Sequence, residues 1–331
     1  MKLAPDCPNK DKAFKNSTEG KVLGISFNTE NLSWNLPEDK RIEYMNTIHS
    51  CLMANEAGVK DCQELLGKLN FVCTMIPFMR TFKKPLQEFL RILEESEMTS
   101  APVPEEVQKD LKTWWKFLDE LGNGLPIPDV SENPPLHHIT LTTDAAGWSK
   151  DSDETMRVGM GGVGLNEEGE IFMVCQNMWD MGKVGSFLDK DGKNLGSKTT
   201  SLEFTGILIP FLLYPEELRN KHVVVQVDNL GCYYAWENGY AKEDDTASIL
   251  VRTLVLVAAK LSCVVYLVHL PRESSWESRL ADRLSREKTT KSGESDLLKG
   301  FEKRKIPRSF KEWMRHPTED WQLPIRVVSE I

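Results

Sequence analysis

The sequence predicts an α/β domain with a mixed five-stranded sheet flanked by helices, preceded by a mostly helical region that contains a β-hairpin. Five strand-like runs follow residue 137, at 138–144, 157–165, 170–176, 222–228 and 263–268. The last two alternate with helical patterns, whereas the first three follow one another directly. This order is typical of a mixed sheet whose later strands run parallel and are covered on both faces.

The first region is predicted from alternation followed by helical spacing. Apolar residues alternate on both sides of 28–31, which predicts a hairpin over 20–36. Pro37 favours a helix start, and Gly58 is a plausible stop. The face expected to be buried in this helix consists of Ile42, Met45, His49, Leu52 and Met53.

Three more helices are expected before the sheet. One follows a capping arrangement at Asp61 and ends at Pro77, one follows Pro85, and one spans about 104–121. The apolar face of the last helix is Leu111, Trp114, Trp115, Leu118 and Leu121.

In the second half, helices are expected from near Ser201, and at about 229–238, 246–261 and 275–286. The predicted domains are residues 1–121, a Gly/Pro-rich linker at 122–136, an α/β domain at 137–287 and a basic extension at 288–331. Between Lys303 and Arg315, six basic residues face one acid. That segment is interpreted either as a solvated tail or as a phosphate contact.

Composition restricts the class of protein. The 331 residues are 40% apolar and 27% charged, which is typical of a globular protein. The net charge of −9 argues mildly against a general nucleic-acid binder. No apolar run approaches the ~20 residues of a membrane span, and the N-terminus lacks an apolar signal-peptide core. We therefore expect a cytoplasmic or nuclear protein that does not bind membranes.

Seven scattered cysteines agree with that expectation. Their number is odd and no Cys-x-x-Cys occurs, so neither a zinc ribbon nor a redox motif is indicated. Most lie in apolar periodic runs, where we expect them to be buried as small hydrophobic residues.

Four acidic residues are the candidate functional site. Asp144 and Asp228 end strand-like runs, Glu203 lies at a helix start, and Asp282 lies off the apolar stripe of the last helix. Individually they could be a turn acid, a helix cap, a dipole partner or a surface ion pair. Sites in open α/β sheets form at the carboxyl ends of strands, however, so adjacent strands would bring Asp144 and Asp228 together. Clustered carboxylates are suited to hold Mg²⁺.

The short sequence motifs around these acids resemble those of a known protein family. The segments Thr143-Asp-Ala-Ala-Gly-Trp148, Leu202-Glu203, Val227-Asp-Asn229, His269-Leu-Pro271 and Ala281-Asp-Arg-Leu-Ser-Arg286 occur in this order. Over residues 137–287 the chain resembles the ribonuclease H domain of retroelement polyproteins, most closely the DIRS-like, tyrosine-recombinase group.

A weaker resemblance extends upstream. Residues 22–40 resemble the primer-grip hairpin at the end of a reverse transcriptase palm. Residues 66–77 and the pair Trp114-Trp115 resemble the thumb and connection helices that follow it.

The resemblance implies a fold, a reaction and partners. The fold is ribonuclease H-like, and the reaction is metal-dependent cleavage of the RNA strand of an RNA–DNA hybrid. Asp144 would bridge two Mg²⁺ ions (or Mn²⁺), with Glu203 and Asp228 holding the ion near the leaving oxygen and Asp282 the ion that activates water. The oligomeric state is left open.

Three further side chains are expected to contact the nucleic-acid backbone. Ser149 and Lys150 follow the first strand of the α/β domain, and Asn229 lies beside the second Asp.

The chain also departs from the family pattern. The polymerase core is missing, and the only Asp-Asp pair, Asp244-Asp245, lies at a helix start, so we predict no polymerase activity. Related elements carry Pro-Gly where this chain has Pro271-Arg272, and Asn where it has Ser278. His269 is interpreted as structural.

Two alternatives therefore remain open. One is a non-catalytic remnant of a retrotransposon polyprotein that binds nucleic acid or protein. The other is another nuclease of the same fold, such as an integrase or an exonuclease.

Overall fold

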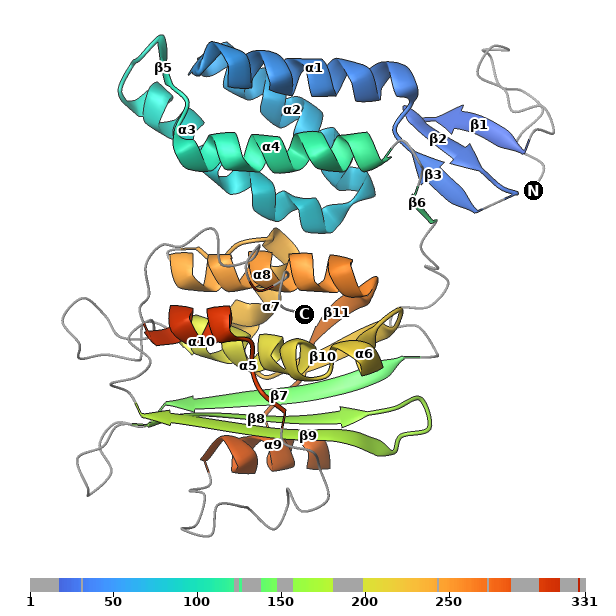
Figure 1. The fold of residues 1–331 in the computed structure, drawn as a ribbon, viewed down its shortest axis with the longest axis vertical. Coiled ribbons are helices and arrows are strands. Elements are labelled where there is room, and N and C mark those ends of the chain that lie inside the picture. Colours follow the sequence, from blue (N-terminus) through green and yellow to red (C-terminus); the bar gives the residue numbers. More distant parts are fainter. Residues whose placement is uncertain are drawn as a thin grey trace. The chain divides into compact units, whose positions relative to one another are not determined.

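The computed structural model describes residues 18–121 except Asn31, 125–126, 138–147, 157–180, 199–286 except Glu243 and Glu273, 304–315 and Val327. The chain forms two compact units, Met1–Val130 and Ser131–Ile331 (Figure 1). Each unit is described by itself. The finer domain boundaries drawn from the sequence stay predictions.

The first unit is mostly helical, with short strands. Its elements are β1 (Glu19–Val22), β2 (Ile25–Asn28), β3 (Ser33–Asn35), α1 (Glu38–Ala54), β4 (Glu56–Gly58), α2 (Val59–Met75), the 3₁₀ helix η2 (Pro77–Lys83), α3 (Lys84–Glu95), β5 (Ser100–Pro102), α4 (Glu105–Glu120) and β6 (Leu125–Pro126).

The hairpin prediction was incomplete. The antiparallel sheet has the order β1-β2-β3-β6, so the segment predicted as one strand before residue 28 is two strands. They are separated by a turn at Leu23 and Gly24, both of which have positive φ angles. Strand β6, which pairs with β3, lies within the predicted linker. The alternation at 20–28 did not reveal this turn, because Leu23 matches the apolar pattern.

The buried face predicted for α1 was wrong. Tyr44, Ile48 and Cys51 are buried, whereas Ile42 and Met53 are 46% and 72% exposed. Both sets of residues have helical spacing, so the choice between them depends on the neighbouring helices. The helix also ends earlier than predicted, because Asn55 adopts the left-handed conformation common after a helix end.

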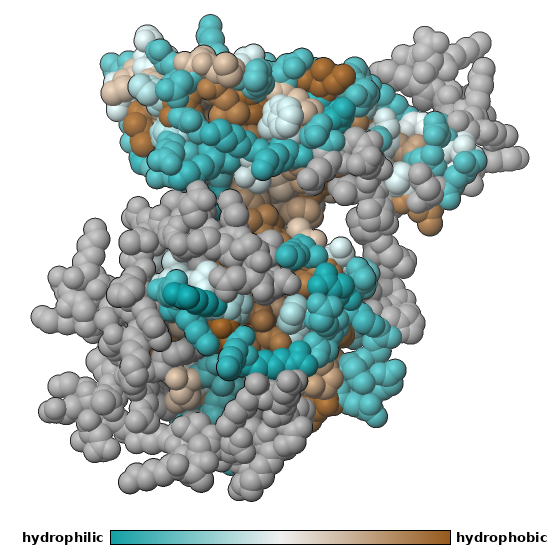
Figure 2. Space-filling model, viewed as in Figure 1, coloured by the Kyte–Doolittle hydropathy of each residue, from teal (hydrophilic) through white to brown (hydrophobic). Residues whose placement is uncertain are grey.

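Helix α4 is close to its prediction. Leu111, Trp114, Leu118 and Leu121 are buried, and Trp114 Nε1 donates a hydrogen bond to the Phe82 carbonyl at 3.0 Å. Trp115, expected on the same face, is 37% exposed. On the visible face of this unit, apolar residues are interspersed among hydrophilic ones (Figure 2).

The second unit is α/β. Its elements are β7 (Ile139–Gly147), β8 (Arg157–Leu165), β9 (Ile171–Asp180), α5 (Thr199–Leu213), α6 (Pro215–Leu218), β10 (His222–Val227), α7 (Leu230–Asn238), α8 (Asp245–Leu261), β11 (Val264–His269), α9 (Trp276–Arg286) and α10 (Arg308–Arg315).

The five strands form one mixed sheet in the order β11-β10-β7-β8-β9. Strand β10 is parallel to both β7 and β11, while β8 is antiparallel to β7 and β9. Helix α9 lies on one face of the sheet, and α5 and α8 lie on the other (Figure 1). The predicted mixed five-stranded sheet flanked by helices is confirmed.

The core of the second unit lies between the sheet and α5 and α8. Every residue of α5 from Ser201 to Leu213 is buried. Ile306, Phe310, Trp313 and Met314 belong to the same core cluster. The segment that stood out in the sequence by its charge therefore also has an apolar side that packs into this unit.

Two expectations from composition can be compared with the structure. Six of the seven cysteines are buried, and Cys7 lies outside the described residues. Among the helices of the described segments, none combines the length and apolar character needed to cross a membrane.

Candidate metal centre at the carboxyl edge of the sheet

Adjacent parallel strands bring Asp144 and Asp228 together. Strand β10 runs beside β7 with Gln226 opposite Thr142, and Asp228 follows the last residue of β10. Strand β7 continues three residues past Asp144 to Gly147, whereas the sequence predicted that it ends at Asp144. Its pairing with β8 continues through the site, where Asp144 faces Gly161.

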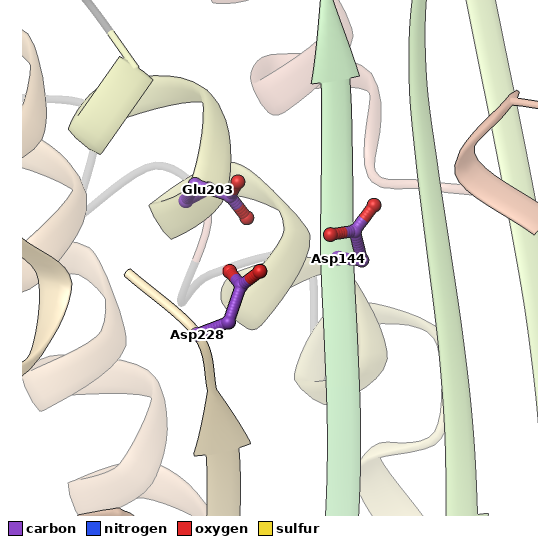
Figure 3. A group of neighbouring side chains, drawn as sticks. All are labelled: Asp144, Glu203 and Asp228. Carbon is purple, nitrogen blue, oxygen red and sulfur yellow. The ribbon is translucent and has the colours of Figure 1, made fainter. Parts of the chain in front are cut away.

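Glu203 reaches the same place from helix α5. Its side chain is only 9% exposed, and its Oε2 accepts a hydrogen bond of 3.1 Å from the Ala145 backbone N–H. Glu203 is thus fixed to the residue next to Asp144. One carboxylate oxygen each from Asp144, Glu203 and Asp228 lie within 4.8 Å of one another (Figure 3).

The electrostatics of this group are unfavourable without a cation. Burial raises the pKa of Asp144 from 3.8 to about 6, although a hydrogen bond from Ser285 opposes the shift. Burial also raises the pKa of Glu203 well above its ordinary value, and the neighbouring Asp144 and Asp228 raise it further. Removing carboxylates from water and placing them together favours their neutral forms.

A divalent cation fits this arrangement. The three side chains offer hard oxygen donors, which Mg²⁺ prefers, and a bound cation would offset both the burial and the mutual repulsion. The prediction that Asp144, Glu203 and Asp228 converge is therefore met in geometry. Their roles as metal ligands stay a prediction.

Asp282 lies in the same pocket but in a different environment. A small pocket is lined by Asp144, Asp228, Asp282 and Arg272, together with Gln226 and Ser278. Asp282 Oδ1 accepts hydrogen bonds from Arg272 Nη2 at 2.8 Å and from Arg286 Nε at 2.9 Å. Burial raises its pKa, but the two guanidinium groups outweigh burial and hold the pKa below its usual value.

Helix α9 can approach the site because β8 is rich in glycine. A Cβ atom on Gly159 would lie 1.8 Å from the Ser285 carbonyl, and one on Gly161 would lie 2.3 Å from the Ala281 carbonyl. The close approach places the Ser285 hydroxyl where it donates to Asp144 Oδ2. Sequence reasoning missed both features, although glycines within a strand are a signal of close backbone approach.

The other predicted residues are placed as follows. Ser149 and Lys150 lie outside the described residues. Asn229 caps helix α7, its Oδ1 accepting from the Cys232 N–H at 3.1 Å, and its contact with nucleic acid stays a prediction. His269 Nε2 lies 3.2 Å from the Asp228 carbonyl oxygen, in agreement with a structural role. Asp244 caps helix α8, as the sequence indicated.

Two basic residues of the 303–315 segment have acidic partners. Arg304 pairs with Glu217 and lies 4.4 Å from the centre of the Tyr214 ring. Arg308 pairs with Glu312 at 2.6 Å. These contacts account for part of the charge that the sequence left open between solvation and phosphate binding.

Comparison with known proteins gives structural likenesses only. No protein-family model and no curated protein sequence matches the chain. Ribonuclease H1 LC11, isolated from compost, is 16% identical over 45% of this chain and 92% of its own, with a TM-score of 0.33. Ribonuclease H1 from Halobacterium salinarum NRC-1 is 13% identical over 45% and 94%, with a TM-score of 0.31.

A viral polyprotein gives a similar result. The prototype foamy virus protease–reverse transcriptase is 14% identical over 56% of this chain and 27% of its own, with a TM-score of 0.29. At such TM-scores, the argument for function has to come from the residues of this chain.

Proposed function

We propose that the second unit is a metal-dependent endonuclease of the ribonuclease H type, which cleaves the RNA strand of RNA–DNA hybrids. The observation that carries this proposal is the convergence of Asp144, Glu203 and Asp228 at the carboxyl edge of two parallel strands. Buried carboxylates are costly unless something compensates them, and a divalent cation does so.

Different residues of the chain would hold the cation and position its ligands. Asp144, Glu203 and Asp228 would hold the cation, and the Ala145 N–H and the Ser285 hydroxyl would fix the carboxylates of Glu203 and Asp144. Bound Mg²⁺ or Mn²⁺ supplies a more acidic water and neutralises charge on the phosphate. Asp282 would hold a second ion at the other side of the pocket.

The substrate and the origin of the chain are part of the same proposal. Recognition of a hybrid would depend on groove shape and 2′-hydroxyl contacts, with Ser149, Lys150 and Asn229 as candidate backbone contacts. The ordered motifs around the four acids support descent from a retroelement reverse transcriptase, with a DIRS-like element as the specific origin that we propose.

One observation favours the alternative of a non-catalytic remnant that binds nucleic acid or protein. The carboxylate of Asp282 already accepts hydrogen bonds from two arginines. A chain that had lost its second metal position could keep the fold without the chemistry. Cleavage of a hybrid separates the two functions.

The decisive experiment is cleavage of a labelled RNA–DNA hybrid by the full chain, with Mg²⁺ or with Mn²⁺. We expect the parent protein to cut the RNA strand and Asp144→Asn to fall to background, since Asn cannot supply an anionic oxygen. The matched control is Glu167→Gln, which removes an exposed carboxylate of the same unit.

Each outcome is informative. Cleavage by the parent and by Glu167→Gln, but not by Asp144→Asn, supports the nuclease and its metal site. Equal cleavage by Asp144→Asn would refute the ligand assignment. An absence of cleavage by all three folded proteins would favour the binding remnant.

A further inference from the structure

Arg272 lies between two of the acidic residues. It follows β11 by three residues, in the turn that the Leu270 N–H anchors to the Val227 carbonyl at 2.9 Å. Its Nη2 lies 2.8 Å from Asp282 Oδ1, and its Nε lies 3.9 Å from Asp228 Oδ2. The guanidinium group thus spans the gap between the carboxylates of Asp228 and Asp282.

The charges in the pocket are divided into two parts. On one side, Asp144, Glu203 and Asp228 face one another, and no basic side chain is hydrogen-bonded to them in the described part of the chain. On the other side, Arg272 and Arg286 both bind Asp282. Of these two, only Arg272 also approaches Asp228 within ion-pair distance.

We propose that Arg272 occupies the side of the pocket where the second divalent ion would bind and competes with that ion for Asp282. The inference rests on the proposed function, which places a second ion at Asp282. A guanidinium and a divalent ion repel each other and cannot share the same carboxylate oxygens. Arg272 is 56% exposed at its side chain, so it can move outward when the ion binds.

The consequence is an asymmetric metal site. Among the described residues, no basic side chain is hydrogen-bonded to Asp144, Glu203 or Asp228, so the ion held by these three does not have to break such a contact. The ion at Asp282 binds only after the ion pair with Arg272 breaks. The second ion therefore binds more weakly than it would if residue 272 were uncharged.

The test is a Mn²⁺ titration of the full chain without nucleic acid. Binding is measured by calorimetry and by the electron paramagnetic resonance signal of free Mn²⁺. We expect Arg272→Gln to strengthen binding of the second ion by about fivefold or more and to leave the first within about twofold, given the energies of partly exposed ion pairs. The control Arg219→Gln removes one positive charge from a pair with Glu216 on the surface of the same unit. It should change neither affinity.

Two more variants identify the cause. Arg272→Lys keeps the positive charge but lacks the planar set of guanidinium donors, so its second-ion affinity should stay close to that of the parent. In the double variant Arg272→Gln with Asp282→Asn, the gain should disappear because the carboxylate that benefits is gone. Circular dichroism of each variant checks the fold.

The outcomes distinguish this inference from the proposed function. If the parent cleaves hybrid and Arg272→Gln binds the second ion no more tightly than the parent does, the role of Arg272 is overturned and the proposed nuclease is not. A parent and an Arg272→Gln variant that bind no Mn²⁺ overturn both. Stronger second-ion binding in Arg272→Gln alone supports the competition even if hybrid cleavage proves slow.

Discussion

At the scale of single residues, the burial of Asp144 makes the stability of the metal-free folded protein depend on pH. The pKa of Asp144 rises from 3.8 to about 6 through burial. The folded protein therefore binds this proton more tightly than the unfolded chain does, and protonation stabilises the fold. That stabilisation is complete below about pH 4 and is lost as the pH rises to about 6 and beyond.

Asp144→Asn should consequently stabilise the metal-free protein at pH 7.5, because Asn resembles the protonated acid. A shift of this size corresponds to at most about 3 kcal/mol. Thermal unfolding in a chelator should show a higher midpoint for Asp144→Asn at pH 7.5, and the difference should shrink towards pH 4.5. A parent that is as stable as the variant at pH 7.5 would show that the carboxylate is not desolvated as described.

The sequence predicted the meeting of Asp144 and Asp228 for a physical reason. Both follow apolar runs that read as strands, and the carboxyl ends of neighbouring parallel strands share one edge of the sheet. For Asp282, helical spacing indicated an ion pair with Arg279 or Arg286, and the structure has the pair with Arg286, but the sequence could not predict the contact with Arg272. Arg272 lies ten residues away in a turn, and the direction of a turn side chain has no periodic signal.

At the scale of elements, the closeness of α9 to β8 decides where Asp282 and Ser285 lie. Gly161 faces the Ala281 carbonyl with no room for a methyl group, and the contact atom is backbone, which cannot rotate away. We expect Gly161→Ala to push α9 outward. Overpacking of this kind costs about 1–3 kcal/mol, and the hydrogen bond from Ser285 to Asp144 would be strained or lost.

Urea unfolding measures the loss of stability in Gly161→Ala, and Mn²⁺ affinity measures the effect of the strained or lost hydrogen bond to Asp144. The control is Gly206→Ala in α5, where the added methyl group would make only ordinary contacts at 3.6 Å or more. Alanine also favours a helix over glycine by about 0.5–1 kcal/mol, so this variant should be neutral or slightly stabilised. Unchanged stability and metal affinity in Gly161→Ala would contradict the close packing of α9.

Helix boundaries were predicted correctly where a particular residue, such as a proline or a capping acid, marked them. The end of α2 before Pro77 and the cap of α8 at Asp244 were predicted from proline and from a capping acid. The face of α1 was mispredicted because two apolar stripes fit the helix, and only tertiary packing selects Tyr44, Ile48 and Cys51.

At the scale of the whole molecule, the core of the second unit includes residues of α10, which lies well after α9, the last helix that covers the sheet. Phe310, Trp313 and Met314 are at most 3% exposed and belong to the main core cluster. The sequence marked this segment by its charge, and its single short helix gave no sign of where its apolar side packs. Long-range packing of this kind cannot be derived from local periodicity.

We therefore expect a chain that ends after residue 287 to lose stability or to aggregate, because an apolar surface of the core becomes exposed. Trp313→Ala tests the same contact with less disruption and should cost about 3–5 kcal/mol, as large-to-small core substitutions do. Arg308→Ala, on the exposed side of α10 and paired with Glu312, should stay within about 0.5 kcal/mol of the parent. Denaturant unfolding of the two variants gives the comparison. If Trp313→Ala proves as harmless as Arg308→Ala, α10 does not belong to the core, and the second unit could be shortened to its sheet and flanking helices.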